Sequence, residues 1–150
     1  MNFKVKRTEL LNALTKVSRA VSLKSPLPVL TGIKFELKED CLVLTGSDSD
    51  ITMQTTISEN IEILEVGSVV LSSKYILEII RKIEGDIVHI YIVDGTLTRI
   101  ESNSSRFDLN GTSYIEYPRI DLNKIGSHFQ LKSSELKQAI EQTSFATSEK

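Results

Sequence analysis

Three acidic residues near the middle of the chain have the spacing of a calcium-binding loop. Asp48, Asp50 and Glu59 stand at its first, third and twelfth positions, where side-chain oxygens bind the ion. The sixth position, which needs glycine for a sharp turn, is Met53. Alternating apolar residues also run through the segment, as is typical of a β-strand. We therefore expect a solvated turn followed by a strand, and no metal site.

Residues that could act as nucleophiles or bases are few and scattered. His89 and His128 have no second histidine or cysteine at ligand spacing. Cys41, the only cysteine, begins an apolar run and is expected to be a buried structural thiol. The chain also lacks a glycine-rich phosphate loop, a Gly-x-Ser-x-Gly elbow and paired carboxylates on one helix face. We expect no catalytic residue, no cofactor and no enzyme activity; a hydrolase would need a nucleophile and base that the sequence does not offer.

Basic residues form the one constellation that points to a function. Residues 1–24 carry a local charge of +5 and residues 25–72 one of −6, although the whole chain has a net charge of −2. In the predicted first helix, Leu10, Leu14 and Val17 share one side at helical periodicity, and Lys16 and Arg19 lie on the opposite side. The apolar side predicts a core contact. The basic side is either a solvated surface or one that attracts phosphates.

Two successive β-α-β-β-β units must position these residues. The first begins with a strand at 3–6 and a helix capped by Thr8, followed by strands at 33–37, 42–44 and 51–57, with 61–66 continuing the sheet. The second begins with a strand at 69–71, a hydroxyl cap at Ser72 or Ser73 and a helix through residue 83. Strands at 87–93, 97–101 and 106–109 follow, with a tight hairpin turn at Asp94–Gly95. The sequence therefore predicts an α+β fold, with two helices packed on antiparallel sheets.

The opening of the chain recurs near its end. Residues 3–22 return at an offset of 126 as residues 129–148, which predicts a first domain at 1–118, a linker at 119–128 and the incomplete start of a second domain at 129–150. Tandem units of this kind can join edge to edge into a closed ring, with their helices on the inner wall. The identical pairs are Phe3/Phe129, Lys6/Lys132, Glu9/Glu135, Leu10/Leu136, Ala13/Ala139, Ser18/Ser144, Ala20/Ala146 and Ser22/Ser148.

Four short segments, together with Leu10-Leu11, carry a resemblance that runs through the whole chain. They are Met1–Val5, Pro26–Leu30, Leu44–Asp48 and Ser105–Leu109. With them the chain resembles the bacterial sliding clamps, the beta subunits of DNA polymerase III. The resemblance implies the DNA clamp fold, with three similar domains per subunit, each made of two β-α-β-β-β halves. It also implies a head-to-tail homodimer that closes a ring around duplex DNA and tethers the polymerase, and it makes this chain an amino-terminal fragment that cannot close the ring alone.

The resemblance also suggests site residues. Lys24 matches a DNA-contacting position of the family, and the helical pattern adds Lys16 and Arg19. Glu149 lies near the family's second DNA-contacting loop and is acidic, which argues against a contact there.

The family's subunit interface suggests a second set of residues. Phe107 and Leu109 match its apolar part, and Arg106 and Lys74 match basic residues that pair with acids of the partner subunit. Ser104 replaces a further basic residue of the family. The alternative is that Phe107 and Leu109 are ordinary core residues of the last strand.

The resemblance suggests partners, and the residues themselves suggest a location. Polymerase and clamp-loader peptides bind between the second and third domains of the family, so this chain lacks those residues. The first residues have no secretory signal and no run reaches the roughly 18 apolar residues of a membrane span, so we expect a cytoplasmic protein. The main alternative is a small β-rich module that binds a protein partner through its sheet edges and has no DNA role.

Overall fold

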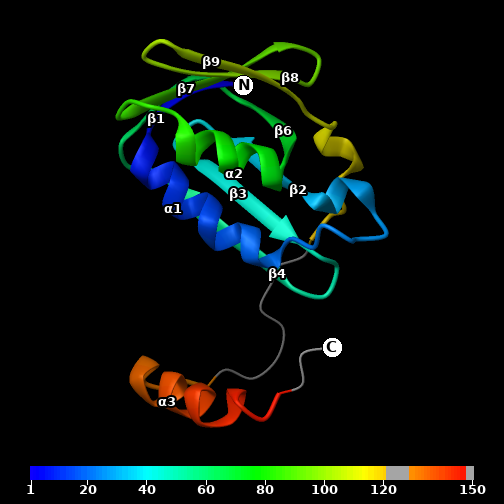
Figure 1. Ribbon diagram of the computed structural model, residues 1–150, viewed down its shortest axis with the longest axis vertical. Coiled ribbons are helices and arrows are strands. Elements are labelled where there is room, and N and C mark those ends of the chain that lie inside the picture. Colours follow the sequence, from blue (N-terminus) through cyan, green and yellow to red (C-terminus); the bar gives the residue numbers. More distant parts are fainter. Residues whose placement is uncertain (121–128, 148–150) are drawn as a thin grey trace. The chain divides into compact units, whose positions relative to one another are not determined.

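The computed structural model describes residues 1–120 and 129–147 (Figure 1). The chain divides into two compact units, Met1–Ile120 and Asp121–Lys150, which are described separately. Arg119 and Ile120, assigned to the linker from the sequence, group with the first unit. Linker residues 121–128, including His128, and residues 148–150, including Glu149, lie outside the described residues.

The first unit contains the two predicted β-α-β-β-β halves and one strand more. The additional strand, β5, ends the first half and lies where the sequence showed the sheet continuing. The elements of the first half are β1 (Asn2–Lys6), α1 (Arg7–Val17), β2 (Gly32–Leu37), β3 (Leu42–Ser47), β4 (Thr52–Ile57) and β5 (Ile61–Glu65). Those of the second half are β6 (Gly67–Ser72), α2 (Ser73–Lys82), β7 (Ile87–Asp94), β8 (Leu97–Ser102) and β9 (Ser105–Asn110). Short 3-10 helices are η1 (Ser18–Ala20), η2 (Pro28–Thr31) and η3 (Tyr114–Glu116).

The two halves exchange their first strands. One antiparallel sheet has the order β5-β1-β7-β8-β9, so β1 of the first half pairs with β7 and joins the three strands of the second half. The other has the order β4-β3-β2-β6, so β6 of the second half pairs with β2 and completes the sheet of the first half. Each half therefore needs the other to complete its sheet.

Both sheets and both helices contribute to one hydrophobic core. Figure 1 shows α1 and α2 side by side; α1 contacts β3 and β4, and α2 contacts β2, β6 and β9. Alternate residues of the strands point toward the helices, as a period of two requires. No helix in the described ranges is both long and apolar enough to cross a membrane. Fully buried core residues include Phe3, Leu10, Leu14, Phe35, Leu44, Ile76, Ile80 and Ile90.

The predicted hydroxyl caps are wrong for both helices. α1 begins at Arg7, after Lys6, and no side chain caps it. Its first N–H group donates to the carbonyl of Asp86, at 2.7 Å, so the backbone of the loop between α2 and β7 takes the place of the predicted cap at Thr8. Ser72 precedes α2 but also makes no capping hydrogen bond. Both helices start directly from a strand, and this tight connection replaces the capping loop.

The hairpin between β7 and β8 is confirmed but displaced by one residue. Asp94 pairs with Leu97, so the two-residue loop is Gly95-Thr96 rather than Asp94-Gly95. Gly95 has a φ of 54°, in the left-handed region that glycine adopts without strain. An irregularity of pairing between Ile92 and Asp94 accounts for the shift in register.

The second unit is described only as a helix and its flanking residues. α3 (Ser133–Ser144) confirms the predicted helix, but residues 129–132 form no strand. A strand needs a neighbour for its backbone hydrogen bonds, and none is present within the described part of this unit. Phe129, Leu131, Leu136 and Ile140 are each about half exposed or more.

An ion pair fastens the edge strand β9 to β8. Arg99 donates from Nε to Oδ1 of Asp108 at 2.7 Å and from Nη2 to Oδ2 at 3.0 Å. This two-bonded geometry holds the pKa of Asp108 below its ordinary value of 3.8. Since the depressed pKa belongs to the folded state, the stabilisation is present above about pH 4 and is lost as pH falls through the folded pKa.

We expect the substitution Asp108→Asn to lower the free energy of unfolding near pH 6. Near pH 3, the difference in the free energy of unfolding between the wild type and this variant should be smaller, because Asp108 is then partly protonated. Urea titrations at the two pH values measure this. Asp94→Asn, at the exposed β7–β8 hairpin, is the matched control. An Asp108→Asn gap that stays constant over the two pH values would contradict the assignment.

Candidate DNA-facing and subunit-interface surfaces

The predicted basic residues are all exposed on or just after α1. Leu10, Ala13, Leu14 and Val17 form the buried face of α1, and Lys16 lies exposed on its other side. Arg19 is not in α1 as predicted but in η1, which continues the chain direction; it is exposed. Lys24 is exposed in the following loop. We call Lys16, Arg19 and Lys24 the basic surface.

Close packing at the end of α1 fixes where this surface lies. A side chain at Gly46 of β3 would collide with the carbonyl oxygen of Val17, so the helix end rests directly on the strand backbone. Ser18 then donates a hydrogen bond from Oγ to the carbonyl of Thr15 at 3.1 Å, which tightens the last turn. Arg19 is therefore presented by a helix end that is anchored on the sheet.

The structure adds basic residues of α2 to the same part of the molecule. Lys74 and Arg81 line a shallow hollow together with Ser18, Val21 and Leu23, at the end of α1. They are seven residues apart, two helical turns, and so share one side of α2. The sequence pointed to Lys74 but not to Arg81; the seven-residue spacing between the two was the available signal.

Strand β9, which carries three of the predicted interface residues, is an edge strand. It pairs only with β8 among the described strands, so its other side has free backbone hydrogen-bonding groups. Phe107 pairs with Ile100 and Leu109 with Thr98, both buried, so these two side chains lie on the core side of the sheet. Leu109 packs partly against the core, whereas Phe107 remains 38% exposed. The core interpretation therefore fits Leu109 better than Phe107.

The two basic interface candidates come from different elements, Arg106 from β9 and Lys74 from α2. Arg106 lies on the opposite face of β9 from Phe107, where its Nε is 3.7 Å from Oε1 of Glu101. Lys74 lines the hollow at the end of α1, which contains no residue of β9, and its ammonium lies 5.7 Å from the centre of the Tyr75 ring. Lys74 thus lies near the basic surface, on a helix that also contacts β9.

The calcium-loop pattern folds as a turn, as expected. Oδ1 of Asp48 accepts hydrogen bonds from the backbone N–H groups of Asp50, at 3.0 Å, and Ile51, at 2.8 Å. These bonds hold the pKa of Asp48 below its usual value. Within the described residues, no three acidic, histidine or cysteine side chains gather at metal-binding distance.

The other candidate reactive residues have structural surroundings. Nε2 of His89 lies 2.7 Å from Oδ1 of Asn2, across the β1–β7 pair. Cys41 is half-buried rather than fully buried as predicted, because it precedes β3 at the turn. Partial burial and the neighbouring Asp40 raise the pKa of its thiol, which disfavours the reactive thiolate.

Comparison with known proteins identifies the relatives of this fold. Residues 1–121 match the family described as DNA polymerase III beta subunit, N-terminal domain. The chain is 38% identical to the beta sliding clamp of Halalkalibacterium halodurans, over 99% of this chain and 40% of that protein. It is also 38% identical to the beta sliding clamp of Staphylococcus epidermidis, of which it covers 41%.

Solved structures give the same result. The crystal structure of the DNA polymerase sliding clamp from Bacillus subtilis superposes with a TM-score of 0.94 at 34% identity, over 100% of this chain and 41% of that one. The beta subunit from the DNA polymerase of Streptococcus pyogenes gives a TM-score of 0.92 at 28% identity, over 100% and 40%. The chain therefore spans about two fifths of the length of its relatives.

The matched family model covers the whole first unit, and the exchanged strands, paired helices and repeated half-domains all lie within it. The chain belongs to the family of DNA polymerase III beta subunits, the beta sliding clamps.

Proposed function

We propose that this chain is the amino-terminal part of a sliding clamp, which encircles duplex DNA and tethers the replicative DNA polymerase. The observation that carries the proposal is the exposure of Lys16, on the side of α1 away from its buried face, and of Arg19 and Lys24 just after the helix. In a ring of clamp domains, this side of the helices forms the inner wall. The clamp loader and the polymerase are partners of the remaining domains, and the protein acts in the cytoplasm.

The mechanism is tethering, without a catalytic step. A closed ring cannot leave DNA sideways, so it keeps a bound polymerase at high effective concentration near its template. Movement along DNA requires contacts that carry no sequence information and exchange rapidly. Lysine and arginine side chains facing phosphates supply such contacts, and salt weakens them.

Ring closure requires an interface, for which we propose the free edge of β9. Phe107 offers a partly exposed apolar side chain beside this edge, with Leu109 next to it on the same face. Arg106 lies on the other face, where an acidic group of a partner subunit can compete with Glu101 for its guanidinium. A head-to-tail homodimer would then continue the sheet across the subunit boundary. Lys74 belongs to the proposal through α2, which contacts β9, although it also lines the hollow at the end of α1.

Replacing Lys16, Arg19 and Lys24 together by alanine tests the DNA contact. The protein is the clamp-length form that the proposal requires, with this chain at its amino terminus. Fluorescence anisotropy measures binding to a short DNA duplex at increasing salt concentrations. The triple variant should bind more weakly, and the magnitude of the slope of log K against log salt should fall by about 0.9 for each lost phosphate contact.

The matched control replaces Lys4, Lys38 and Arg119 by alanine. This triple substitution removes the same charge, at positions outside α1 and α2. We expect it to leave the slope nearly unchanged. Equal slopes for the wild type and for the variant at Lys16, Arg19 and Lys24 would show that the basic surface does not contact DNA. This result would favour a protein-interaction module.

Phe107→Ser tests the proposed subunit interface in the same clamp-length protein. Losing this apolar contact should raise the dimer dissociation constant about tenfold or more, measured by sedimentation over a dilution series. Val93→Ser, a similarly exposed apolar position on β7, should leave dimerisation unchanged. A Phe107→Ser protein that dimerises like the wild type would show that this side chain serves the fold alone.

A further inference from the structure

A groove of about 600 Å³ crosses the face of the β4-β3-β2-β6 sheet opposite α1 and α2. Its floor follows one row of paired residues, Lys34, Thr45 and Gln54, with Glu36 beside them. These side chains alternate with the core residues Phe35 and Leu44, so they point away from the helices. The groove is therefore separate from the basic surface and from β9. We call it the outer groove.

The wall of the outer groove is built by the segment that follows β9. Thr112 pairs with Val70 of β6 through two backbone hydrogen bonds, of 3.0 and 2.8 Å. Tyr117 is then buried against Leu30 and Val70, in a small apolar cluster outside the main core. Its hydroxyl donates to the carbonyl oxygen of Thr45 at 3.4 Å. Backbone pairing, burial and this hydrogen bond fix the wall to the floor.

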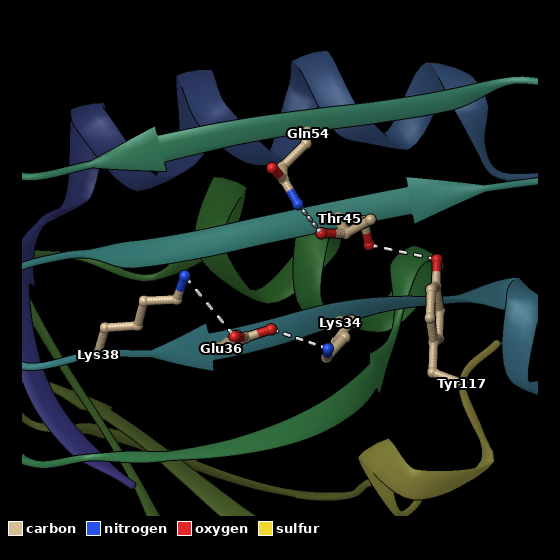
Figure 2. A network of polar contacts seen from close by, with 6 residues as sticks. All are labelled: Lys34, Glu36, Lys38, Thr45, Gln54 and Tyr117. Atoms are coloured by element: carbon tan, nitrogen blue, oxygen red, sulfur yellow. Dashed lines mark hydrogen bonds and ion pairs between the residues drawn. The ribbon is translucent and has the colours of Figure 1, made fainter. Parts of the chain in front are cut away.

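Hydrogen bonds also order the floor (Figure 2). Gln54 donates from Nε2 to Oγ1 of Thr45 at 3.1 Å. The carboxylate of Glu36 contacts Nζ of Lys34 at 2.8 Å and Nζ of Lys38 at 3.8 Å. The hydrogen bond from Lys34, more than its charge, lowers the pKa of Glu36. The groove has a definite shape before anything binds, which limits the entropic cost of binding.

The outer groove combines excess positive charge with exposed apolar side chains. Of the charged residues that line the groove, Lys34 and Arg119 are basic and Glu36 is acidic. Lys34 already contacts the Glu36 carboxylate, which leaves the guanidinium of Arg119 for a ligand. Glu116 belongs to the wall segment but does not line the groove. On the rim, Ile115 is 78% exposed and Tyr114 47% exposed. Large exposed apolar side chains next to a formed groove are characteristic of a binding site.

We propose that the outer groove binds a short acidic peptide segment of a partner protein, with an apolar side chain against Tyr114 and Ile115 and carboxylates near Lys34 and Arg119. Charge complementarity selects acidic residues, and the apolar rim selects an aliphatic or aromatic neighbour. A nucleic acid fits less well, because its phosphate backbone offers no apolar side chain to Ile115 on the rim. The site adds a contact to the clamp that is independent of the groove between the second and third domains.

The test uses the 150-residue chain labelled with ¹⁵N and the capped tetrapeptide Glu-Leu-Ile-Glu as probe. We expect the amide signals of Thr45, Gln54, Ile115 and Tyr117 to shift in a saturable manner. Ile115→Ser and Arg119→Glu should each weaken binding about threefold to tenfold. Both positions are exposed, so folding should be preserved. Ile51→Ser and Arg81→Glu are matched controls at exposed positions outside the groove, and they should bind like the wild type.

Two further probes separate the alternatives. Lys-Leu-Ile-Lys reverses the charge, and Glu-Ser-Ser-Glu removes the apolar side chains; both should bind more weakly than Glu-Leu-Ile-Glu. The proposal is overturned if the three peptides shift the same signals equally, if none shifts them, or if only a hexathymidine oligonucleotide does. Binding of Glu-Leu-Ile-Glu that the Ile115→Ser and Arg119→Glu variants retain in full would also overturn it.

Discussion

The exchange of β1 and β6 between the two halves is the constraint on which the rest of the structure depends. Because β1 completes the sheet of the second half and β6 that of the first, neither half can bury its apolar face alone. The exchange also brings the starts of α1 and α2 to strands of opposite sheets, so that both helices share one core. Backbone pairing between segments distant in sequence thus determines the positions of both helices, independently of the surface residues.

The proposed surfaces follow from that arrangement. With the apolar sides of α1 and α2 turned to the sheets, their polar residues are left on the other side, where Lys16, Lys74 and Arg81 are exposed, and Arg19 follows in η1. β9 is an edge strand because β1 and β5 extend its sheet at the opposite end, next to β7. In the β4-β3-β2-β6 sheet, the face turned away from the helices carries Tyr117 and the outer groove. DNA, a second subunit and a peptide would each meet a different side of this domain.

Local pattern predicted most of the elements, because side-chain periodicity records which face is buried. Leu10, Leu14 and Val17 marked the core side of α1, and alternation through Ile33, Phe35 and Leu37 marked β2. The strand exchange left no such local signal, because the partner of β1 lies more than 80 residues away at β7. The same holds for the start of α1, where the carbonyl of Asp86 replaces the cap expected from Thr8. Arg119 and Tyr117 stood in or next to a presumed linker, so the outer groove could not be recognised from the sequence.

Fragment complementation measures the strand exchange most directly. Residues 1–66 and 67–120, produced separately, divide the domain between β5 and β6. The account predicts that neither fragment shows cooperative unfolding or protected amides alone, and that an equimolar mixture regains both, with β1 and β7 protected together. A fragment 1–66 that folds cooperatively by itself would contradict it, because β1 would then need no partner from the second half.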